Sequence, residues 1–205
     1  MELLGVGYAH LKTSDGGELY LTRHGQPFWE HLLPENWYAR EWFETNRERL
    51  LGTSIVYKVP TRRIRGTGLH LVVKWSRVGE DVPLDTMTIN KFIDAEFNSP
   101  FEEFSLLMEL RAGETGPPGI RIRAQKPLAI YVPSERLQLW QTGRSESRIA
   151  AKLARHPGVE LDILRQYVVL YGWVKGCDLA ELAGQWQLEP EAREKLLAQG
   201  MSLVN

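Results

Sequence analysis

The chain of 205 residues has little cysteine, almost no net charge and no long apolar run. Its one cysteine, Cys177, excludes an internal disulfide framework and a cysteine-rich zinc site. The 25 basic and 26 acidic side chains nearly cancel, so bulk charge does not favour nucleic acid. Residues 1–5 lack the basic region and apolar run of a signal peptide, and no stretch is long enough to span a bilayer. We expect a cytoplasmic protein whose partners include neither nucleic acid nor a membrane.

Histidine is also sparse, which bears on metal binding. The five histidines are scattered, without the spacing that places two ligands on one helix face or in one turn. We therefore predict no structural metal. Tryptophan, by contrast, is plentiful: the seven tryptophans indicate large buried or half-buried aromatic surfaces.

The order of the expected elements indicates the fold class. In chain order they are a hairpin over 7–22, helical segments over 28–50 divided at Pro34, strands within 51–75, a helix over 99–111, strands at 120–123 and 128–132, a helix over 145–153, a strand at 167–173, and helices over 178–183 and 190–203. Strands and helices cluster rather than alternate, which favours an α+β fold. We expect a twisted antiparallel sheet of about five strands with one main packed helix over 100–111.

The strand that ends at Lys74 carries the most specific signal. The apolar run from Leu69 to Val73 leads directly to this lysine and then to Trp75. An ammonium at the end of a buried strand is costly unless an anion lies beside it. Taken alone, the segment also fits an edge-strand lysine that reaches solvent. Its meaning therefore depends on what the rest of the chain can place nearby.

Three other segments supply candidate neighbours for Lys74. The small-residue turn Gly52-Thr53-Ser54 lies between two expected strands and could turn backbone N–H groups toward an anion. Glu102 and Glu103 lie near the start of the helix over 99–111. Further along, the apolar strand at 167–171 continues through a Gly-Trp-Val-Lys-Gly-Cys-Asp-Leu run into a helix.

This order resembles the N-terminal lobe of the protein-kinase-like superfamily. There a glycine loop covers ATP, a strand lysine contacts its phosphates, a helix glutamate pairs with that lysine, and a hinge holds the adenine. The resemblance implies that Lys74 and Glu103 are the catalytic pair, with Glu102 as the alternative carboxylate. The residues that it implies around the nucleotide are Gly52, Thr53, Ser54, Val56, Val72, Tyr171, Gly172, Trp173 and Val174.

The resemblance covers residues 46–205 and differs from the family pattern at two places. Only Gly52 matches the longer glycine pattern, and the catalytic loop and metal-binding Asp-x-Gly would follow the helix over 190–203. We expect an extension at 1–45, an N-lobe at 46–175 and the start of a second lobe at 176–205. The expected ligand is ATP, with Mg²⁺ only where the second lobe is present. The fragment alone would be inactive, and its phosphoacceptor, a protein or a small molecule, is not specified.

Two alternatives remain open at this stage. The lobe could belong to a pseudokinase-like or scaffolding module that transfers no phosphate. Separately, Arg23-His24-Gly25 resembles the signature of histidine phosphatases, in which the histidine accepts the phosphate. That family needs a second histidine followed by glycine and an alternation of strands and helices. Neither requirement is met by the sequence, so we rank this alternative last.

Overall fold

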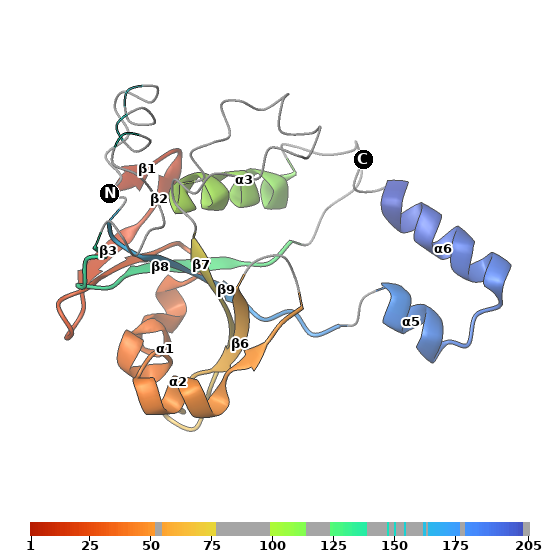
Figure 1. Ribbon diagram of the computed structural model, residues 1–205, viewed down its shortest axis with the longest axis horizontal. Coiled ribbons are helices and arrows are strands. Elements are labelled where there is room, and N and C mark those ends of the chain that lie inside the picture. Colours follow the sequence, from red (N-terminus) through yellow and green to blue (C-terminus); the bar gives the residue numbers. More distant parts are fainter. Residues whose placement is uncertain are drawn as a thin grey trace.

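The structure is a computed structural model that describes residues 1–51, 55–76, 99–113, 124–138, 164–176 and 179–202, with single residues between 147 and 162. Its main feature is a seven-stranded antiparallel sheet with the strand order β3-β4-β8-β9-β7-β6-β5 (Figure 1). Those strands are β3 (Ala9–Lys12), β4 (Glu18–Leu21), β5 (Glu48–Arg49), β6 (Val56–Pro60), β7 (His70–Ser76), β8 (Pro127–Val132) and β9 (Tyr167–Gly172). A separate two-stranded hairpin is formed by β1 (Glu2–Leu3) and β2 (Val6–Gly7).

Helices lie on both faces of the main sheet (Figure 1). The short helices α1 (Trp29–Leu32) and α2 (Arg40–Asn46), flanked by 3₁₀ turns at Gln26–Phe28 and Pro34–Asn36, pack on one face. The opposite face carries α3 (Pro100–Ala112) and the β1–β2 hairpin. The last two helices, α5 (Leu179–Gln185) and α6 (Pro190–Ser202), contact each other and lie to one side of the sheet.

Each face of the sheet buries its own apolar core, because successive side chains of a strand point to opposite faces. In β7, Leu71 and Val73 join the core that contains Trp37, whereas Val72 joins the core that contains Phe104. The central strands β8 and β9 are covered on both sides, which explains their continuous apolar sequences. The lysine at position 74 follows the alternation and therefore faces α3.

The structure confirms the α+β class and the antiparallel sheet, but the sheet is larger than predicted. The reason is the β3–β4 hairpin. Because β4 pairs with β8, β3 and β4 extend the same sheet to seven strands rather than about five. The helical segment predicted over 28–50 is also too long, since α2 ends at Asn46 and β5 begins at Glu48. The predicted turn at 52–54, strand at 120–123 and helix segment at 151–153 lie outside the described residues.

The main packed helix, α3, begins as the sequence predicts. The Ser99 side chain caps it by accepting a hydrogen bond of 3.2 Å from the backbone N–H of Phe101, and Pro100 occupies the first turn. Gly113 ends the helix in a left-handed conformation, with φ of 82°. These two ends fix which turn of α3 carries Glu103.

Candidate functional site

The register of three central strands gathers the predicted site residues on the sheet face below α3. Across β7, Lys74 pairs with Val56 of β6 and with Val169 of β9. Two residues earlier, Val72 pairs with Lys58 on one side and with Tyr171 on the other. Residues at such positions point to the same face. The surface next to Lys74 is therefore mostly apolar, formed by three valines and a tyrosine.

Lys74 forms an ion pair with Glu103, across the gap between β7 and α3. Its Nζ lies 2.8 Å from Oε1 and 3.0 Å from Oε2 of the carboxylate, and each side chain is 30 % exposed. Glu103 lies in the first turn of α3, where the helix dipole favours a negative charge. The ammonium is thus neither fully buried nor simply solvated, and part of it remains open to a second anion.

Tyr171 holds the same carboxylate from the other side. Its hydroxyl donates a hydrogen bond to Oε1 of Glu103, and the residue is only 3 % exposed. Burial raises the pKa of Tyr171 far above its usual value, and the negative charge of Glu103 raises it further. Tyr171 therefore stays a neutral donor, and Glu103 is fixed by donors from two neighbouring strands, β7 and β9.

The segment that leaves β9 closes one end of this surface. The Gly172 N–H donates to the carbonyl of Lys126 at 3.0 Å, and the Trp173 N–H donates to the carbonyl of His70 at 2.9 Å. The backbone N–H groups of Gly172 and Trp173 are therefore already used within the protein. The N–H of Val174, whose side chain is 53 % exposed, has no acceptor in the described part of the chain.

Lys58 is a further cation at this edge, and the sequence analysis missed it. Its Nζ lies 4.8 Å from the ring centroid of Trp173 and 2.9 Å from Oε2 of Glu48. Because Lys58 follows Val56 by two residues in β6, the two side chains are expected on the same face of the sheet. The sequence does not show, however, which strand pairs with β6, and so it does not predict which residues surround Lys58.

Eight of the predicted site residues are described, and six of them are brought together. Lys74 and Glu103 pair directly, Tyr171 bonds to Glu103, and Val56, Val72 and Trp173 pack in the same apolar cluster. Gly172 and Val174 flank Trp173 in the exit segment. The turn Gly52-Thr53-Ser54 lies outside the described residues.

The rival signature at Arg23-His24-Gly25 follows the end of β4. The His24 N–H donates to the hydroxyl of Thr22, and burial lowers the pKa of the His24 ring, helped by nearby Arg111, Arg23 and Lys126. The sheet that contains β4 is antiparallel, whereas the phosphatase family requires strands and helices that alternate along the chain. The phosphatase interpretation thus gains no support from the topology.

Among the described residues, no group of three or more histidine, cysteine, aspartate and glutamate side chains could hold a metal ion. No helix in the same part of the chain has the length and apolar character needed to cross a membrane. Comparisons of the whole chain with known protein families, with curated proteins and with solved structures found no match.

Proposed function

We propose that this chain is the ATP-binding lobe of a protein-kinase-like phosphotransferase. The observation that carries the proposal is the half-exposed Lys74 on β7, paired at 2.8 Å with Glu103 of the helix that follows it in the chain. In protein kinases a strand lysine and a helix glutamate form such a pair, and the lysine contacts the phosphates of ATP. The proposal rests on this geometry and on the order of the elements.

The apolar surface beside Lys74 suits a nucleotide base. Val56 of β6 and Trp173 are partly exposed on the α3 side of the sheet, and both pack against the cluster that contains the buried Val72 of β7. The N–H of Val174, which has no acceptor among the described residues, can donate one hydrogen bond to the edge of an adenine ring. The phosphates would then extend toward Lys74, with the turn at 52–54 predicted to cover them.

Glu103 and Tyr171 position the lysine. The carboxylate holds the Lys74 ammonium at the end of the apolar surface, and the tyrosine holds the carboxylate. A bound phosphate would accept hydrogen bonds from the exposed part of the Lys74 ammonium.

The reaction moves the γ-phosphoryl group of ATP to a hydroxyl oxygen of an unidentified protein or small molecule, and it releases ADP and a proton. Mg²⁺ would neutralise charge on the phosphates and, in this family, is held by residues of the second lobe. We place this activity in the cytoplasm, in keeping with the single cysteine.

Calorimetric titration of the chain with ATP tests the proposal. We expect saturable binding, weakened about tenfold or more in Lys74→Met, which corresponds to about 1.4 kcal/mol. Lys12→Met is the matched control, because Lys12 also pairs with a glutamate at 2.9 Å but lies on the edge strand β3, four strands away from β7 in the sheet. Circular dichroism would establish that both variants fold.

Two results would overturn the proposal: no measurable binding of ATP by the folded chain, or equal binding by Lys74→Met and the parent. If the full-length protein binds ATP but transfers no radiolabelled phosphate to any hydroxyl, including water, the pseudokinase-like alternative replaces the phosphotransferase.

A further inference from the structure

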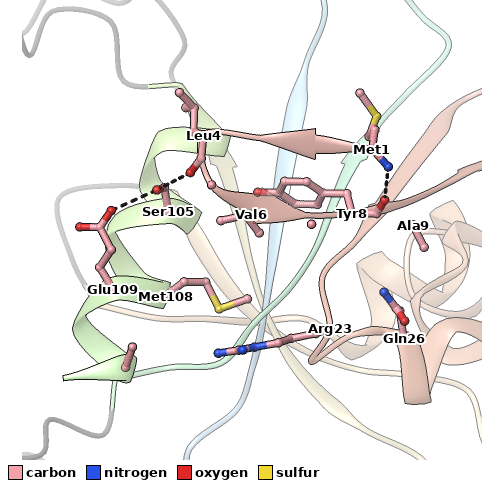
Figure 2. Close-up of a pocket in the computed structure, with 13 residues that line it drawn as sticks. Met1, Leu4, Val6, Tyr8, Ala9, Arg23, Gln26, Ser105, Met108 and Glu109 are labelled. Atoms are coloured by element: carbon pink, nitrogen blue, oxygen red, sulfur yellow. Dashed lines mark hydrogen bonds between the residues drawn. The ribbon is translucent and has the colours of Figure 1, made fainter. Parts of the chain in front are cut away.

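Helix α3 also lines a pocket on the side opposite Glu103. At 100° per residue, Ser105, Met108 and Glu109 lie on the far side of the helix from the Lys74 pair. They face the β1–β2 hairpin and the turn after β4, and together these segments line an open pocket of about 700 Å³ (Figure 2). That volume is within the range of small-molecule sites. The pocket is separated from the nucleotide surface by the thickness of α3.

The pocket has a fixed apolar wall. Val6 and Met108 contribute side chains from β2 and α3. The hairpin is tied to the helix, because the hydroxyl of Ser105 donates to the carbonyl of Leu4 at 2.7 Å. The buried Tyr8, at 4 % exposure, lies in the same wall, and its hydroxyl has no hydrogen-bond partner among the described residues. Because the Tyr8 hydroxyl is itself buried, the wall offers the pocket an apolar surface.

The opposite side of the pocket carries positive charge. The side chain of Arg23 extends below Met108 toward the end of α3 (Figure 2), and it forms no ion pair with any described residue. Arg111 and Lys126 lie close enough to His24, with Arg23, to lower the pKa of its ring. His24, Arg111 and Lys126 do not line the pocket themselves, and the lining cations are Arg23 and the N-terminal ammonium of Met1, which donates to the carbonyl of Tyr8. The one carboxylate of the pocket, on Glu109, is turned toward Ser105.

We propose that this pocket binds a small amphiphilic anion, whose carboxylate or phosphate head pairs with Arg23 and whose apolar body packs along Val6 and Met108. A guanidinium binds either head group through two parallel hydrogen bonds. The positive charges of Arg23 and of the Met1 ammonium attract an anion and disfavour a cation. The site uses none of the residues assigned to the nucleotide, so it holds whether or not ATP binds.

Three eight-carbon probes test the proposal by NMR on protein with labelled methionine methyl groups. Octanoate and octyl phosphate carry the two candidate head groups, and octylamine carries the opposite charge on the same chain. We expect saturable shifts of the Met108 methyl with at least one acid and none with octylamine. Bound anion should also raise the pKa of His24, because a negative charge favours the protonated ring.

Arg23→Gln should weaken acid binding at least tenfold, whereas Arg40→Gln, on α2 beneath the other sheet face, should not change it. Arg23 is exposed, so its variant should keep the unfolding midpoint of the parent. Equal affinity for octylamine and the acids, or full affinity in Arg23→Gln, would overturn the proposal. So would acid binding that leaves the Met108 methyl unshifted, since the probe would then lie elsewhere.

Discussion

The contact between Tyr171 and Glu103 yields the most quantitative prediction. Replacing Tyr171 by Phe removes the hydroxyl that donates to Oε1 of Glu103 and leaves the ring in place, 3 % exposed in the parent. A hydrogen bond to a charged acceptor is worth about 1.5–3 kcal/mol. Glu103 keeps Lys74 as a partner and is 30 % exposed, so water replaces part of the lost bond. We expect the free energy of unfolding to fall by about 1–2 kcal/mol.

The same Tyr171→Phe substitution should also be made in the Glu103→Leu variant. There the buried Tyr171 hydroxyl loses its acceptor, so removing the hydroxyl should cost nothing or should stabilise the protein. The double-mutant cycle should therefore give a coupling energy of about 1–2 kcal/mol between the two positions. Urea titrations monitored by tryptophan fluorescence give the free energy of unfolding of all four proteins in the cycle. A loss of about 1.5 kcal/mol corresponds to a melting point lower by about 3–6 °C in a domain of this size.

The reasoning would be refuted if Tyr171→Phe cost the same in both backgrounds, because the hydroxyl would then not act through Glu103. It would also be refuted by a neutral effect in the parent. The control is Tyr57→Phe: Tyr57 lies on β6 but packs in the core below the opposite sheet face, and no hydrogen bond of its hydroxyl is seen to any described residue.

Two further predictions concern stability. Glu18, whose pKa is held well below its usual value first by the hydroxyl of Tyr20 and then by Lys12, stabilises the fold while it is ionised. Its folded pKa lies below the unfolded value, so this contribution is present above about pH 4.5 and is lost as the pH falls further. The unfolding free energy of Glu18→Gln should therefore be lower than that of the parent at pH 7, with a gap that narrows below pH 4.5 in urea titrations. A gap independent of pH would contradict the assignment. Gly25→Ala should cost more than about 2 kcal/mol, because the new Cβ would lie 2.1 Å from the carbonyl oxygen of Leu128; normal thermal stability of that variant would show that the turn can shift.

The local parts of the fold could be predicted from sequence, and the long-range parts could not. Ser99 and Pro100 indicated the start of α3, and Ser14 to Gly17 indicated the turn of the β3–β4 hairpin. That hairpin, however, joins the main sheet through β8, more than 100 residues later in the chain. Its attachment depends on which strand edge is left open after packing, and no local pattern encodes that.

The candidate site shows the same division. The sequence indicated that the strand-end ammonium of Lys74 needs an anion, but only the resemblance to the kinase-like lobe selected Glu103 as its partner, since a carboxylate at a helix start is also favourable by itself. The hydroxyl of Tyr171 reaches that carboxylate only because β9 lies beside β7. The placement of Lys58 over Trp173 likewise depends on pairing across the sheet. The pocket beside Arg23 brings together a hairpin and a helix whose contacting residues, Leu4 and Ser105, are 101 residues apart, and neither segment predicts the other.

The central claim is that Lys74 contacts phosphate, and the ratio of two affinities tests it most directly. Adenosine contacts only the apolar surface and the exit segment, whereas ATP also reaches the ammonium. The account predicts that the parent binds ATP about tenfold or more tightly than adenosine, and that Lys74→Met binds both about equally, with the adenosine affinity unchanged. A preference for ATP that survives in Lys74→Met would contradict the account.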